Sequence, residues 1–103
     1  MAGPLVLAID QGTSSTKCLL VDENCGVVGR GQAPVSLATP EPGWVQQDAD
    51  EIWTSVRLAV AAALDAASAK RVVSVGLSVQ RESCVIWDRR SGEALTPVLS
   101  WQD

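Results

Sequence analysis

The chain has 103 residues, of which 47% are hydrophobic and 19% charged, and its formal net charge at pH 7 is −4. This length and composition fit one packed globular domain at most and exclude an intrinsically disordered chain. The acidic balance argues against nucleic acid as a partner, because binding to a phosphate backbone requires an excess of Lys and Arg.

The sequence also lacks the signals of membrane insertion and secretion. No apolar run approaches the roughly 20 residues needed to cross a bilayer, and the first residues lack the basic end and apolar stretch of a secretory signal. Cys18, Cys25 and Cys84 form no CxxC pair, and the chain has no histidine. We therefore expect no disulfide framework, no zinc site and no membrane contact, but reduced thiols in a cytoplasmic protein.

Three strands are predicted in the first third of the chain. The apolar run at residues 5–9 is typical of a strand buried on both faces. Further strands are expected at residues 17–22 and 27–32, joined by a turn that contains two acids, Asn and Gly. Because these links are short, neighbouring strands should run antiparallel.

A helix is predicted after a loop at residues 34–43 that contains three prolines and a glycine. Asp48 can cap the helix, and Glu51 can reach back to complete a capping box. Apolar residues then recur at steps of three and four, at Ile52, Val56, Ala59, Ala63 and Ala67. The spacing predicts one helix of about six turns that docks through one apolar face.

The rest of the chain predicts three more strands. Residues 72–79 are mostly apolar, so we expect a strand in the centre of the sheet, and residues 84–87 and 96–101 should pair around a turn at residues 88–92. The order of elements indicates an α/β fold, a mixed sheet with a helix on one face. Nothing after the last strand resembles a closing helix, so we expect an incomplete domain.

The turn between the first two predicted strands carries a notable set of polar groups. It supplies four hydroxyl groups, those of Thr13, Ser14, Ser15 and Thr16. Gly12 lets the backbone approach an anion, and the hydroxyls can donate to phosphate oxygens. Asp10 suits a magnesium ion that bridges to phosphate, and Lys17 adds positive charge. Because the GxxxxGK[ST] and GxGxxG spacings are absent, composition alone slightly favours a simple hairpin turn without a ligand.

The motifs together resemble a known family. The turn "DQGTSSTK" (10–17) is followed in the family's order by "PGWVQQDADEIW" (42–53), "QRESCVIWD" (80–88) and "SWQD" (100–103). These stretches resemble the FGGY carbohydrate kinases, above all those acting on glycerol, over residues 5–103. The resemblance implies a ribonuclease H-like fold of the actin-like ATPase superfamily, with residues 1–103 as part of its N-terminal domain. It also implies a kinase that uses ATP and Mg²⁺ to phosphorylate a small polyol or sugar, with glycerol as the expected substrate.

The resemblance also implies roles for single residues. The residues expected to bind the nucleotide's phosphates are Asp10, Gly12, Thr13, Ser14, Ser15 and Lys17, with Asp10 also serving the metal. Arg81 and Glu82 are expected to hydrogen-bond polyol hydroxyls, and Trp101 to back the polyol's carbon chain. The family's catalytic base and adenine site lie beyond residue 103. No catalytic residue is therefore expected in this chain, which should be inactive and self-associate when isolated.

Several departures from the family pattern leave the polyol open. Val79 stands where asparagine is usual, Gln46 and Gln47 replace Glu-His, and Lys17 replaces a common arginine. Alternative functions are another sugar or sugar-alcohol kinase, an actin-like or chaperone-like ATPase, and an interaction module that has lost catalysis. The Arg81–Glu82 pair argues against a filament or chaperone, although without the resemblance it would be an ordinary surface ion pair of little energetic value.

Overall fold

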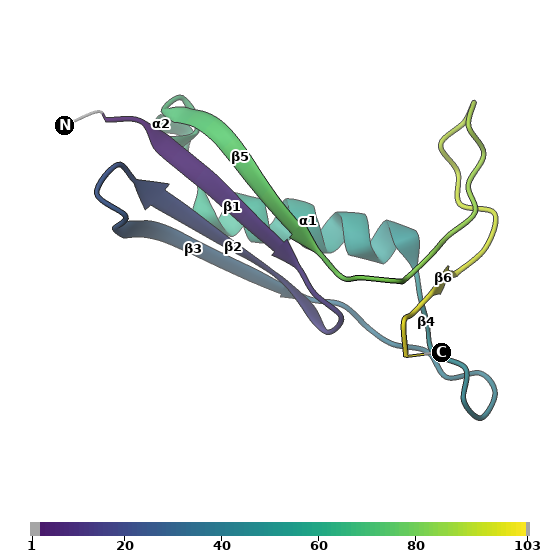
Figure 1. Cartoon of the computed structure of the whole chain (residues 1–103). Coiled ribbons are helices and arrows are strands. Elements are labelled where there is room, and N and C mark those ends of the chain that lie inside the picture. The colour runs from purple at the N-terminus through teal and green to yellow at the C-terminus, as the bar shows by residue number, and fades with distance from the viewer. Residues whose placement is uncertain (1–2, 103) are drawn as a thin grey trace.

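Figure 1 shows the computed structural model, which describes residues 3–102, as a twisted sheet with a long helix lying across it. The strand order is β3-β2-β1-β5, in which β1 spans Leu5–Gln11, β2 Ser15–Asp22, β3 Val27–Pro34 and β5 Val72–Val79. The first three strands run antiparallel, as predicted, and β5 runs parallel to β1. The predicted mixed sheet is confirmed.

The hydrophobic core lies between the sheet and helix α1 (Ala49–Ala63). Because side chains alternate along a strand, one face of β1 and β2 points toward the helix. The buried hydrophobic strand residues on that face are Leu5, Leu7, Cys18 and Leu20. Burial raises the pKa of the Cys18 thiol, which makes this cysteine a packing residue rather than a reactive one.

Two glycines of β3 let α1 lie directly on the sheet. A Cβ atom at Gly31 would lie 1.9 Å from the carbonyl oxygen of Ala59, and one at Gly29 would lie 2.2 Å from that of Ala63. The buried residues of α1 are correspondingly small, with Ser55 added to the predicted Ala59 and Ala63. Backbone-to-backbone contact therefore sets the distance between helix and sheet.

We expect Gly31→Ala to destabilise the chain by about 3 kcal/mol, because the new methyl group meets helix backbone that cannot rotate away. Gly76→Ala in β5 is the matched control, since a Cβ there has no neighbour within 4 Å. Its unfolding free energy should stay within about 0.5 kcal/mol of the parent value. Urea unfolding of both variants measures the difference, and equal midpoints would contradict the close contact.

The prediction of one six-turn helix is wrong. α1 ends at Ala63 because Leu64 is extended, and a separate short helix, α2, spans Ala66–Ala69. Asp65 caps α2 by accepting a hydrogen bond from the Ser68 backbone N–H, a bond that lowers the pKa of Asp65. This local cap competes with continuation of the first helix. Neither helix in the described part of the chain has the length and apolarity needed to span a bilayer.

At the start of α1 the predicted cap is confirmed but the capping box is wrong. The Asp48 side chain accepts a hydrogen bond of 2.8 Å from the backbone N–H of Asp50. The Glu51 carboxylate does not complete a box but accepts a hydrogen bond from the backbone N–H of Ser36. Glu51 thus fastens the loop after β3 to the helix.

β5 lies at an edge of the sheet, which corrects the prediction of a central strand. The helix packs mainly on β2 and β3, so it leaves β5 largely uncovered. Val75, Leu77 and Val79 are 56%, 67% and 58% exposed. β5 is therefore an apolar strand whose outer edge is unpaired within residues 3–102.

A second small sheet lies beyond the end of β5 (Figure 1). It pairs β4 (Gln46–Gln47) antiparallel with β6 (Val98–Leu99). Of the predicted pairing of residues 84–87 with 96–101, one isolated bridge is present, Cys84–Leu99; a second bridge joins Trp87 to Ala94, outside the predicted range. β6 instead pairs with a segment for which no strand was predicted. Residues near positions 47, 80 and 101 thereby lie beside the β1–β2 turn.

Candidate functional site

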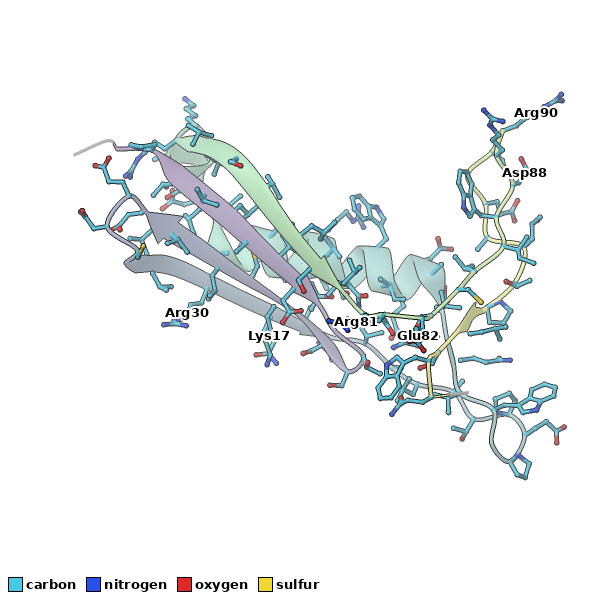
Figure 2. The ribbon with its side chains drawn as sticks, viewed as in Figure 1. Lys17, Arg30, Arg81, Glu82, Asp88 and Arg90 are labelled. Atoms are coloured by element: carbon cyan, nitrogen blue, oxygen red, sulfur yellow. The ribbon has the colours of Figure 1, made fainter. Side chains whose placement is uncertain are left out.

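A cavity of about 310 Å³ opens where the parallel strands β1 and β5 end. In α/β sheets, ligands commonly bind at the carboxyl ends of neighbouring strands. The lining comes from three segments and comprises Asp10, Gln11, Gly12, Thr13, Val79, Gln80, Arg81, Glu82 and Trp101. The structure thus gathers predicted phosphate-binding and polyol-binding residues around one cavity. Figure 2 shows Arg81 and Glu82 at this end of the sheet.

The β1–β2 turn contributes only some of its predicted residues to the cavity, namely Asp10, Gly12 and Thr13. Ser14 and Ser15 lie outside the lining, and their carbonyl groups hold the turn in shape. The Gly12 N–H donates to the Ser15 oxygen and the Val35 N–H to the Ser14 oxygen, each at 2.9 Å. Phosphate binding by these two serines stays a prediction.

Thr16 faces away from the cavity, so its expected role as a phosphate donor is wrong. It is fully buried, and its Oγ1 lies 2.7 Å from the Oγ of Ser55 in α1. The Ser55 hydroxyl donates to the Ile52 carbonyl, which leaves Thr16 as the donor to Ser55. The alternation of side chains along β2 turns Thr16 toward the helix and into the core.

Lys17 lies on the opposite face of the sheet from α1, across from Asp10 in the strand register. Figure 2 shows it projecting from that face on the same side as Arg30. Both cations line a second hollow of about 570 Å³, and Asp10 lines this hollow as well as the first cavity. Asp10 is thus shared by the two spaces. A ligand that passed Asp10 would bring its charge near Lys17.

Arg81 and Glu82 follow directly after β5, at a turn of the backbone. Glu82 has a φ of +63°, in the left-handed region that residues other than glycine seldom adopt. Such conformations cluster at binding sites, where the surrounding structure holds them in place. Arg81 offers a planar set of donors and Glu82 offers acceptors, a combination that can bind adjacent hydroxyl groups.

Trp101 reaches the cavity from the far end of the chain. Its indole Nε1–H donates to the Thr13 hydroxyl at 2.8 Å, and its backbone N–H donates to the Ser83 hydroxyl at 3.1 Å. The side chain is 53% exposed. An exposed indole ring can cover the C–H surface of a small polyol or sugar.

Three glutamine side chains, which we call the glutamine network, lie beside the cavity. The Nε2 of Gln80 donates to the Oε1 of Gln11 at 3.1 Å and to the Oε1 of Gln47 at 3.0 Å. Gln11 in turn donates to the Gly12 carbonyl at 2.8 Å, and Gln47 to the Thr13 carbonyl at 2.6 Å. Reasoning from the sequence missed this network. The only signal was a glutamine in each of three motifs.

The carboxylates at the cavity fit a magnesium ion that arrives with a phosphate ligand. Within residues 3–102, no group of three or more His, Cys, Asp or Glu side chains could hold a metal ion. The cavity lining includes Asp10 and Glu82. Mg²⁺ keeps several waters and binds through one or two carboxylates together with phosphate oxygens. The donor set fits such an ion and does not fit a metal enclosed by protein ligands alone.

Known proteins share this sequence pattern. Residues 5–103 match the profile of the N-terminal domain of the FGGY family of carbohydrate kinases. The chain is 46% identical over 103 residues to a glycerol kinase of Rhizobium rhizogenes, covering 98% of this chain and 21% of the relative. It is 47% identical over 100 residues to a glycerol kinase of Brucella ovis, covering 95% and 20%. The chain therefore spans about a fifth of the length of these relatives.

Solved structures share the fold. A xylulose kinase from Rhodospirillum rubrum superposes with a TM-score of 0.86 at 29% identity, covering 96% of this chain and 21% of that one. A glycerol kinase from Plasmodium falciparum, solved with ADP, gives a TM-score of 0.81 at 29% identity, covering 98% and 21%. The expected α/β fold of the actin-like ATPases is confirmed.

Proposed function

The chain belongs to the FGGY family of carbohydrate kinases, and we propose that it supplies the phosphate-binding turn and the polyol site of an ATP-dependent glycerol kinase. One observation carries the proposal. Residues expected to bind phosphate and residues expected to bind polyol, separated by up to 91 positions, line a single cavity. The glycerol kinase relatives and the neighbour solved with ADP support glycerol and ATP as ligands.

On the polyol side, Arg81 and Glu82 bind neighbouring hydroxyl groups, and Trp101 covers the carbon chain. An arginine supplies donors only and a glutamate acceptors only, so the pair fixes both the position and the orientation of a diol. Orientation matters because phosphoryl transfer depends largely on positioning and on charge stabilisation.

On the nucleotide side, the β1–β2 turn binds the phosphates with Gly12, Thr13, Ser14 and Ser15. Lys17 adds positive charge from the neighbouring hollow. Asp10 would hold Mg²⁺, and the ion would neutralise charge on the phosphoryl group. The general base and the adenine contacts come from residues outside this chain, which forms part of an N-terminal domain. The three free cysteines fit a reducing, cytoplasmic location.

A chimaeric kinase tests this function. Residues 5–103 replace the matching segment of the Rhizobium rhizogenes glycerol kinase, and ATP-dependent phosphorylation is measured on glycerol, xylulose and other polyols and sugars. We expect the highest kcat/KM with glycerol. A preference for xylulose would instead favour a sugar kinase, an alternative supported by the shared fold of the xylulose kinases. The same exchange into the Brucella ovis enzyme provides a second host, and two folded chimaeras without activity on any acceptor would overturn the proposal.

Arg81→Ala in the chimaera should raise the KM for glycerol about tenfold or more, because a hydrogen bond to a charged group contributes about 1.5–3 kcal/mol. The KM for ATP should stay within about twofold, since Arg81 contacts hydroxyls rather than phosphates. Arg90→Ala is the matched control, because Figure 2 places Arg90 on a turn far from Arg81. Equal rises in both Michaelis constants would remove Arg81 from the polyol site.

A further inference from the structure

A continuous set of hydrogen bonds joins the two halves of the cavity through Gln80. On one side its Nε2 group binds Gln11 and Gln47, which hold the carbonyls of the β1–β2 turn. On the other side the Ser83 hydroxyl donates to the Gln80 Oε1 at 2.9 Å and accepts from the Trp101 backbone N–H. We infer that Gln80 is a positioning residue that couples the phosphate-binding turn to Trp101, on the side of the cavity that we call the Trp101 wall. This role rests on the proposed kinase function.

The orientation of each amide in this network follows from the groups at its ends. A backbone carbonyl only accepts hydrogen bonds, so Gln11 and Gln47 must present their NH₂ groups to the turn. Their Oε1 atoms then face Gln80, which must present its own NH₂ group to both. The Gln80 Oε1 is left to accept from Ser83. The hydrogen bonds are therefore directional and allow no amide to be reversed.

Gln80 has no donor left for a ligand. Both hydrogens of its NH₂ group are used, one toward Gln11 and one toward Gln47, and its oxygen accepts from Ser83. Gln11 and Gln47 are only 6% and 3% exposed. Among the described residues, no buried side-chain nitrogen or oxygen lacks a partner. Gln80 therefore does not donate to a ligand, and its NH₂ group acts through its neighbours.

This arrangement fixes the two reacting groups relative to each other. The turn positions the phosphates and Trp101 positions the polyol. Gln80 links them through Ser83, in addition to the direct hydrogen bond from the Trp101 indole to Thr13. Because small errors in the placement of reacting atoms can cost large factors in rate, a shared anchor serves phosphoryl transfer. We call the hydrogen bonds from Gln80 to Gln11 and Gln47 the turn arm, and the hydrogen bond from Ser83 to Gln80 the other arm. The two arms differ chemically, since Gln80 donates in the first and accepts in the second. Single substitutions can therefore remove the hydrogen bonds of each arm separately.

Gln80→Glu in the chimaera cuts the turn arm. A carboxylate still accepts from Ser83 but cannot donate to Gln11 or Gln47, whose oxygens it repels. We expect the KM for ATP to rise about tenfold, while the KM for glycerol stays within about twofold. Equal changes in both constants, or no change in either, would overturn the positioning role.

Ser83→Ala cuts the other arm and should give the opposite result, because it removes the hydrogen bonds of the Ser83 hydroxyl to Gln80 and Trp101. The hydrogen bonds from Gln80 to Gln11 and Gln47 remain. We expect the KM for glycerol to rise about fivefold and the KM for ATP to stay within about twofold. Ser74→Ala, at an exposed serine of β5 far from the cavity, is the control and should change neither. Opposite responses of Gln80→Glu and Ser83→Ala exclude a general loss of stability.

Hydrogen exchange on the ¹⁵N-labelled 103-residue chain tests the same coupling without activity. In Gln80→Glu, the Gln47 side-chain NH₂ should exchange about fivefold faster while the Trp101 backbone amide is unchanged; Ser83→Ala should reverse this. An inactive chimaera with this exchange pattern would reject the kinase proposal and leave the coupling standing. Unchanged exchange in both variants would reject the coupling itself.

Discussion

Asp10→Asn should lower the kcat of the chimaeric kinase by about a hundredfold or more and leave the KM for glycerol within about twofold. The substitution keeps the shape of the side chain and removes its charge. Asp10, the penultimate residue of β1, lines both the cavity and the hollow that contains Lys17. Loss of the carboxylate weakens the hold on Mg²⁺, whose charge acts on the transferring phosphoryl group rather than on the polyol.

Titration with Mg²⁺ separates this effect from a structural one. The variant should need a higher Mg²⁺ concentration for half-maximal rate, whereas a misfolded variant would not respond. Asp88→Asn is the matched control, because Asp88 lies on a distant turn in Figure 2. Its carboxylate only accepts local hydrogen bonds from the Ser91 and Arg90 backbone, which lower its pKa. Wild-type turnover of Asp10→Asn at limiting Mg²⁺ would contradict the metal role.

The isolated 103-residue chain should be catalytically silent and should form dimers or larger assemblies. β5 has the sequence VVSVGLSV, without a charged residue or proline, and its outer edge is unpaired within residues 3–102. Unpaired N–H and C=O groups on an apolar edge strand are a template for pairing with a second copy. The lack of catalytic activity has a separate cause, because the base and the adenine contacts are proposed to lie outside this chain.

Light scattering and a coupled assay for ADP test the two parts of this prediction. Val75→Lys should shift the chain toward monomer, because a lysine on an edge strand disfavours pairing. Val28→Lys is the control: Val28 is 55% exposed, like Val75 at 56%, but it lies on β3 at the other edge of the sheet. A compact monomer at high concentration would contradict association. Glycerol-dependent release of ADP by the isolated chain would contradict the predicted lack of catalytic activity.

The elements that the sequence predicted well are those with local causes. The opening strands follow from an apolar run and short turns, and the Asp48 cap depends on residues two positions apart. The errors concern choices made at longer range. The edge position of β5 depends on where α1 packs, and the pairing of β6 with β4 joins segments about 50 residues apart. Local patterns carry no information about these contacts.

The residues of the candidate site also include some that the sequence predicted and some that it missed. Arg81, Glu82 and Trp101 were predicted because charged and aromatic residues within family motifs have recognisable chemistry. The glutamine network was missed, because an amide carries no charge and fits many environments. Its contacts also link residues 33 and 69 positions apart. Thr16 was misassigned since its hydroxyl is chemically equal to that of Thr13, and only the direction of the side chain distinguishes them.

The hydrogen bond between Trp101 and Thr13 spans 88 positions of the chain, which has a consequence for synthesis on the ribosome. β1, β2 and β3 are neighbours in sequence and can pair while translation continues, because local contacts form early. The cavity cannot close until residue 101 has left the exit tunnel. The nascent protein therefore carries a folded sheet before it carries a ligand site, and substrates can contribute to its stability only after residue 101 has been released.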